Sequence, residues 1–269
     1  MHIVERRIYA GCTLEIQRYL TETVRAGSGS GPNPRFKNPE DRKEFMLARS
    51  RRKFERLVNQ NFTPAGFYCT FTFDEENECH TVEETNYLRG LFTRRLRRKY
   101  PDAKIVSVIG KGKKTHRYHA HMLIEGIPED FVRSQWTYGD VVRVDHLREH
   151  NYYDGVDHGR DYTALADYML NHWTPEQGQR KWKGTRNLKQ PEIEVIKESA
   201  GEAVKRSFHD SKVPDTPEGY MFVDAKETKY GFNCFKFVLD PKKKRQRKLK
   251  GRKEDKRRQR KKTETRQRK

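Results

Sequence analysis

Two histidines, His119 and His121, stand one residue apart at the start of the apolar run 117–126 (RYHAHMLIEG). Alternate residues of a β-strand lie on one face, so we expect both imidazoles on the same side of a strand, together with Leu123 and Glu125. Two imidazoles placed in this way can bind a single cation. A cation held there would polarise an oxygen of a phosphate ester. The pattern therefore predicts a metal site that acts on a phosphate.

The segment before this strand is strongly basic. It contains Lys111, Lys113, Lys114, His116 and Arg117. Lysine and arginine side chains supply most of the sequence-independent affinity of proteins for nucleic acid. We therefore expect Lys111, Lys113, Lys114 and Arg117 to contact DNA phosphates close to the two imidazoles.

A tyrosine on a separate helix is the candidate nucleophile. The helical pattern at 160–173 places Tyr162 in the centre of an apolar stripe and Tyr168 about 100° away from that centre. Tyr162 is therefore expected in the core, and the two hydroxyls do not share a face. A phenol has a pKa of about 10 and needs a nearby cation or base to attack phosphorus. The sequence predicts that Tyr168 alone performs the attack.

The elements that must position these groups follow from the spacing of apolar residues. The expected helices are a basic helix at 42–62, a helix capped by Thr81 and Glu84 that ends before Pro101, a short helix at 129–136 and the helix at 160–173. The expected strands lie at 67–73, with one apolar and one polar side, and at 103–110, 118–126 and 139–147. This order predicts an α+β fold with a central antiparallel sheet and flanking helices, similar to ferredoxin-like and RNA-recognition folds.

Composition divides the chain into four parts. Residues 1–41 are expected to be a partly ordered segment that ends in a flexible loop, residues 42–191 the main domain, and residues 192–240 an extension with a strand pair packed on it. Residues 241–269 contain 18 Lys or Arg against 3 acidic residues. Such a run is expected to be a disordered basic tail that binds polyanions by releasing counterions.

The rest of the composition limits the setting. The four cysteines form no C-x-x-C pair, and no stretch approaches 18 apolar residues. We expect a cytoplasmic protein in a reducing compartment, with no membrane partner. No phosphate-binding loop of the G-x-x-x-x-G-K-[ST] type occurs, so any DNA unwinding must come from another protein.

Three motifs together resemble those of the HUH (His-hydrophobic-His) endonucleases that initiate rolling-circle replication of phages, plasmids and integrative elements. They are FYCTFTFD at 67–74, HRYHAHMLIEG at 116–126 and RDYTALADYMLN at 160–171. The stretch KWKGTRNLKQP at 181–191 is similar to one that follows the tyrosine helix in this group. The similarity extends over most of residues 1–240.

The resemblance implies a divalent ion, Mg²⁺ or Mn²⁺, bound by His119 and His121. It implies that Tyr168 nicks one DNA strand at a replication origin, remains on the 5′ phosphate as a phosphotyrosine and later rejoins the strand. The free 3′ hydroxyl would prime synthesis by host proteins, with a helicase and a polymerase as partners. Further DNA contacts are implied for Asn171, Arg180, Lys181, Lys183 and Arg186.

The sequence departs from this family at two positions. Gly110 stands where a third metal ligand, commonly an acid, is often found, so His116 or Asp74 is the possible substitute. Glu125 fits less well because it lies two pleats from His121. Asn171 stands where a lysine often follows the tyrosine by three residues, which leaves open how the leaving oxygen is stabilised.

Two other functions fit parts of the sequence. The run HLREH, from His146 to His150, matches a zinc-protease pattern with Glu149 as the base, which requires that the segment form a helix. The chain also has the basic and aromatic residues of a non-catalytic protein that binds single-stranded nucleic acid. Such a protein would keep its single-strand binding in a Tyr168→Phe variant and would never form a covalent adduct.

Overall fold

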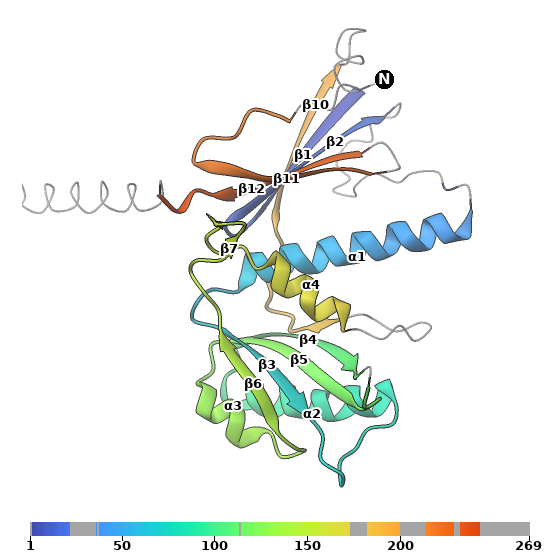
Figure 1. Ribbon diagram of the computed structural model, residues 1–269, viewed down its shortest axis with the longest axis vertical. Coiled ribbons are helices and arrows are strands. Elements are labelled where there is room, and N and C mark those ends of the chain that lie inside the picture. Colours follow the sequence, from blue (N-terminus) through green and yellow to red (C-terminus); the bar gives the residue numbers. More distant parts are fainter. Residues whose placement is uncertain are drawn as a thin grey trace, which may run out of the picture.

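The computed structural model describes residues 2–21, 36, 38–112, 114–172, 182–199, 213–228 and 232–242. They form two five-stranded antiparallel sheets, with two helices between the sheets and two more on the far side of the central one (Figure 1). The α+β class and the central antiparallel sheet predicted from the sequence are confirmed.

The central sheet has the strand order β6-β3-β5-β4-β9, and all its neighbouring strands are antiparallel. Its strands are β3 (Phe67–Thr72), β4 (Lys104–Lys111), β5 (Tyr118–Glu125), β6 (Val141–His146) and β9 (Lys183–Gly184). Along the chain, α2 (Val82–Lys99) lies between β3 and β4, α3 (Glu129–Gln135) between β5 and β6, and α4 (Thr163–Asn171) between β6 and β9. A two-stranded ribbon, β7 (Tyr152–Tyr153) with β8 (Val156–Asp157), precedes α4.

Both faces of the central sheet are buried. One face, with Phe71, Ala120 and Met122, packs against α2 and α3 as the alternation predicts. The other face was expected to be polar, yet Tyr68 is fully buried there among residues of α1 and α4. Helix α1 covers this face with Phe54, Leu57 and Val58, which lie in one cluster with Tyr68.

Helix α1 (Pro39–Asn61) begins three residues before the predicted start at 42. The side chain of Asn38 accepts a hydrogen bond from the backbone N–H of Asp41, and Pro39 occupies the first turn, where its missing N–H is not needed. The helix lies between the two sheets (Figure 1). No helix in the described ranges is long and apolar enough to cross a lipid bilayer.

The second sheet joins the two ends of the described chain. Its order is β10-β1-β2-β12-β11, with β1 (His2–Ala10), β2 (Thr13–Thr21), β10 (Glu192–Ser199), β11 (Tyr220–Thr228) and β12 (Phe232–Leu239). The pairing of β11 with β12 matches the predicted strand pair, while the pairing of β12 with β2 was not foreseen. On α1, Arg56 donates two hydrogen bonds, of 2.7 and 2.8 Å, to Glu15 of β2 and so fixes this sheet to the helix.

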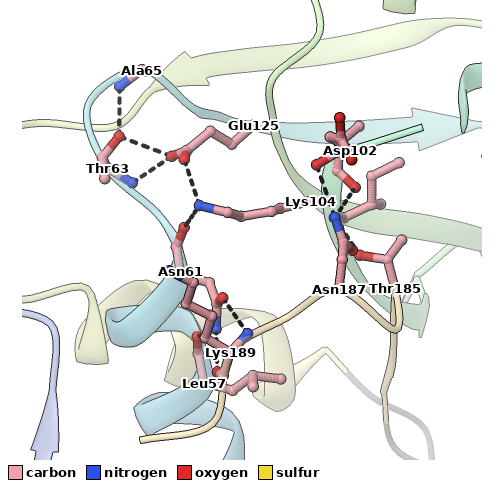
Figure 2. Close-up of polar contacts among 12 residues, drawn as sticks. Leu57, Asn61, Thr63, Ala65, Asp102, Lys104, Glu125, Thr185, Asn187 and Lys189 are labelled. Carbon is pink, nitrogen blue, oxygen red and sulfur yellow. Dashed lines mark hydrogen bonds and ion pairs between the residues drawn. The ribbon is translucent and has the colours of Figure 1, made fainter. Parts of the chain in front are cut away.

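A polar network fixes the C-terminal end of α1 to the central sheet (Figure 2). Asn61 donates to the backbone oxygens of Leu57 and Lys189, at 2.9 and 2.8 Å, and accepts from the backbone N–H of Lys189 at 2.8 Å. Lys104 donates to the Asn61 backbone oxygen and to Glu125, at 2.9 and 3.0 Å. Glu125 therefore takes part in the network that joins α1 to the central sheet.

Candidate metal centre and adjacent tyrosine

His119 and His121 lie on the central strand β5, on the side that faces α1 and α4. His119 is opposite Thr72 and Gly110, and His121 is opposite Thr70 and Val108. Their Nε2 atoms are 3.0 Å apart. Two ligands bound at right angles to one ion, each at about 2.1 Å, would lie about 3.0 Å apart, so this spacing suits a shared cation.

The third imidazole comes from His172, the C-cap residue that follows α4. One ring nitrogen from each of His119, His121 and His172 lies within 4.8 Å of the others, and this cluster can hold a metal ion. Ala166 and Met169 bury one side of α4 in the core and so hold its end above the sheet. His172 follows Tyr168 by four residues, but the sequence did not identify it as a ligand.

Gly110 explains why the third donor comes from α4. A Cβ atom at this position would lie 2.6 Å from His119 Nε2 and 2.8 Å from the backbone oxygen of His172. These separations are too short for any side chain. The place where the resemblance implies an acidic ligand is thus filled by the His119 ring and the end of α4.

Burial keeps the sheet-borne imidazoles neutral. Loss of solvation, followed by repulsion from His119 and His172, lowers the pKa of His121 to about 3. Burial also lowers the pKa of His119. Neutral imidazole is the form that binds metal, so neither ring has to lose a proton near pH 7.

Tyr68 orients the ring of His121. The Tyr68 Oη atom lies 2.5 Å from His121 Nδ1 and 2.9 Å from Thr70 Oγ1. Metal-binding histidines commonly use their second nitrogen in such a contact, which fixes the ring and leaves the other nitrogen free to bind. Burial raises the pKa of Tyr68, so its hydroxyl stays protonated. The sequence placed Tyr68 on the same face as Thr70 but did not indicate this role.

Tyr168 lies next to the imidazoles, on the same side of the sheet. The centroid of its ring is 4.6 Å from that of His172 and 6.0 Å from that of His121. The residue is 40% exposed, so a bound substrate can reach it. Tyr162, by contrast, is buried as predicted, and its hydroxyl donates a 3.0 Å hydrogen bond to the backbone oxygen of Arg148.

Two arginines bring positive charge to this site. Arg51 of α1 donates to Asp167 and to Asn171, both at 2.9 Å, so a guanidinium lies where Asn171 replaces the lysine of the family pattern. Arg143 on β6 is exposed, forms an ion pair with Asp145 of the same strand and lies near Tyr68 and Tyr168. Neither arginine belongs to a sequence motif, and only the packing of α1 and β6 beside the cluster reveals them.

The two expected alternatives for the third ligand are not part of the cluster. His116 is exposed in the loop before β5. Asp74 accepts hydrogen bonds from the backbone and side chain of Asn77, at 2.9 and 2.8 Å. His172 therefore takes the position that the sequence assigned to one of them.

The remaining predicted DNA contacts have different surroundings. Lys111 lies over the ring of Tyr118, and Arg117 pairs with Glu78 at 2.9 Å. Lys114 lies in the exposed turn between β4 and β5. Lys183 and Arg186 lie at the β9 edge of the sheet. Lys113, Arg180 and Lys181 lie outside the described residues.

The zinc-protease pattern HLREH does not form the helix that it requires. His146 ends strand β6, and the residues that follow it up to His150 are neither helix nor strand. His146 lies 3.0 Å from Glu129, whereas His150 lies 2.7 Å from Asp157. The two histidines thus have separate partners, and this reading of the motif is wrong.

Comparison with known proteins adds no relative. No protein-family model matches the chain, and no similar curated protein or solved structure was found. The function must therefore be argued from the site itself.

Proposed function

We propose that this protein is a metal-dependent endonuclease of the HUH type, which nicks single-stranded DNA and rejoins it through a 5′-phosphotyrosine. The observation that carries the proposal is the position of Tyr168, whose ring lies 4.6 Å from that of His172 and 6.0 Å from that of His121. A nucleophile and a metal-binding cluster on one accessible face are the two groups that phosphoryl transfer to a protein requires.

In the proposed reaction the Tyr168 oxygen attacks the phosphorus of a phosphodiester. The new Tyr168 O–P bond forms as the bond from phosphorus to the 3′ oxygen breaks, and the phenolic proton ends on that 3′ oxygen. The reverse reaction consumes the 3′ hydroxyl and restores the phosphodiester. A divalent ion on the cluster supplies electrostatic stabilisation of the phosphate.

Side chains around Tyr168 support binding of the substrate phosphate. Arg143 is exposed beside the tyrosine, and Arg51 is held next to α4 by Asp167 and Asn171. Guanidinium groups bind phosphate oxygens with charge-assisted hydrogen bonds. We assign Arg143 to the scissile phosphate and Arg51 to a neighbouring one.

Of the two ions expected from the sequence, we propose Mn²⁺ as the better fit. Three imidazoles form the cluster. Mg²⁺ prefers oxygen ligands and retains its water molecules, whereas imidazole is a common ligand of transition metals. Activity should therefore be higher with Mn²⁺ than with Mg²⁺ at equal concentration.

The setting that accompanies this activity is also proposed. The protein would act in the cytoplasm at the replication origin of a phage, plasmid or integrative element. A host polymerase would extend the 3′ hydroxyl, and a host helicase would separate the strands.

The proposal is tested by formation of a covalent adduct. The full chain is incubated with labelled single-stranded oligonucleotides covering a candidate origin and with Mn²⁺, and then denatured in SDS. We expect a labelled protein band that is lost in Tyr168→Phe and retained in Tyr162→Phe. Single-strand binding that survives Tyr168→Phe, with no adduct from the wild-type chain on any origin strand, would instead indicate a non-catalytic binding protein.

A further inference from the structure

A second basic surface lies on the opposite face of the central sheet from the histidines. It is a groove of about 580 Å³ between α2, strand β4 and the segment 183–186. Ser107 of β4 lines this groove and points toward α2, while its neighbours Val106 and Val108 point toward the histidine face. We call it the α2 groove, and it is lined by Arg89, Gly90, Thr93, Arg94, Arg97, Arg98, Pro101, Ile105, Ser107, Lys183, Gly184, Thr185 and Arg186.

Positive charge dominates the α2 groove. Six of its lining residues are lysine or arginine, and none is acidic. Within the described part of the chain, Arg94, Arg97 and Arg98 form no ion pair with a carboxylate. Their charges are therefore available to an anionic ligand.

Arg89 forms the floor of the groove. Its side chain is only 7% exposed and donates a 2.9 Å hydrogen bond to Ser107 Oγ. Its Nε atom is buried and has no hydrogen-bond partner among the described residues. Burial lowers the pKa of Arg89 to about 10, so the group is still charged at pH 7. A buried guanidinium without a carboxylate partner is costly unless an anion binds to it.

Gly90 keeps the wall of the groove open. It lies within α2, where glycine is less favourable than alanine because its backbone loses more conformational freedom on folding. A Cβ atom at this position would meet nothing within 4 Å. Packing within the described chain therefore does not require glycine here, whereas a ligand that approaches the helix backbone would.

We propose that the α2 groove binds the sugar-phosphate backbone of duplex DNA. At about 1.5 Å per residue, Arg89 to Arg98 covers about 13 Å of helix, which is long enough to contact more than one phosphate of a DNA strand. Hydroxyl groups of Ser107 and Thr185, which accept hydrogen bonds from Arg89 and from the backbone N–H of Ile105, keep their own protons for further phosphate contacts. Sites for single strands use aromatic side chains on which bases stack, and no aromatic residue lines this groove.

This binding site is independent of the chemistry proposed for the histidine cluster. The two sites lie on opposite faces of the sheet, and duplex binding through phosphates needs no divalent ion. If duplex binding is measured in EDTA, a failure of the groove proposal can therefore be distinguished from a failure of the nuclease proposal.

The test measures binding of the full chain to a fluorescent 20-base-pair duplex of arbitrary sequence, by anisotropy, over a range of NaCl concentrations. The groove variants are Arg94→Gln with Arg98→Gln, and Gly90→Glu, which adds a carboxylate in open space. The control, Arg42→Gln with Lys43→Gln, removes the same charge from exposed residues of α1. Circular dichroism checks that each variant is folded.

We expect the double groove variant to weaken duplex binding by roughly tenfold or more at 0.1 M NaCl and to reduce the salt slope by about 1.8, at about 0.9 per phosphate. Gly90→Glu should weaken binding similarly, and the control should change little. Equal losses in groove and control variants, or unchanged binding by Gly90→Glu, would overturn the proposal. A greater loss of single-strand or poly-glutamate binding than of duplex binding in the groove variants would also overturn it.

Discussion

Gly110→Ala tests the geometry of the metal centre with a single methyl group. The new Cβ atom would lie 2.6 Å from His119 Nε2, about 0.8 Å inside the 3.4 Å at which ordinary contacts begin, and 2.8 Å from the backbone oxygen of His172. The His119 ring and the end of α4 must both move to accommodate it. Metal sites tolerate ligand displacements of only about 0.2 Å.

We therefore expect Gly110→Ala to weaken Mn²⁺ binding by about tenfold to a hundredfold, the loss typical when ligands are poorly positioned. Calorimetric titration of the metal-free protein with Mn²⁺ measures this change. The matched control is Gly90→Ala, because the same methyl group there enters open space. This control should bind Mn²⁺ like the wild type and unfold with a free energy higher by about 0.5–1 kcal/mol.

A folded Gly110→Ala protein with wild-type Mn²⁺ affinity would refute this reasoning. It would mean that His119 and His172 do not bind the ion in the arrangement described. An equal loss of affinity in the Gly90→Ala control would refute it as well, since that change leaves the cluster untouched.

Three further predictions concern the same site and its support. His172→Ala should reduce Mn²⁺ affinity at least about tenfold in a titration, because one of three nitrogen donors is lost. In the metal-free protein the pKa of His121 is about 3 in the folded state and about 6.5 in the unfolded state. The unfolded state therefore takes up more protons, and the free energy of unfolding falls as the pH drops from about 6.5 toward 3. His121→Gln should reduce that slope by up to about 1.4 kcal/mol per pH unit in urea titrations, and an unchanged slope would contradict the assignment. Asn61→Ala should lower the free energy of unfolding by about 1–3 kcal/mol, since it removes the hydrogen bonds between the Asn61 side chain and the backbone of Leu57 and Lys189, and a loss under 0.5 kcal/mol would contradict it.

Much of the central domain could be predicted because its signals are local. Alternation in 67–73 and 118–126 identified β3 and β5 and the face of each histidine, and Thr81 caps α2 as expected. The second sheet could not be predicted in the same way, because β1 and β2 pair with strands about 180 to 225 residues later. No local pattern specifies which distant strand is the partner.

The candidate site was only partly visible in the sequence for the same reason. His119 and His121 are two residues apart, so strand periodicity placed them together. His172 reaches them only because α4 packs over β4 and β5, and the sequence favoured His116 or Asp74, which are closer along the chain. A histidine four residues after the candidate tyrosine was the available signal, since such residues share a helical face.

The most direct test of the nucleophile is tandem mass spectrometry of the DNA-linked protein. Trypsin releases residues 161–180, a peptide that contains both Tyr162 and Tyr168. After nuclease trimming, fragmentation of this peptide locates the attached nucleotide phosphate. We predict that it is bonded to the oxygen of Tyr168. A nucleotide on Tyr162, or on a residue outside this peptide, would contradict the arrangement of imidazoles and phenol on which the proposed function rests.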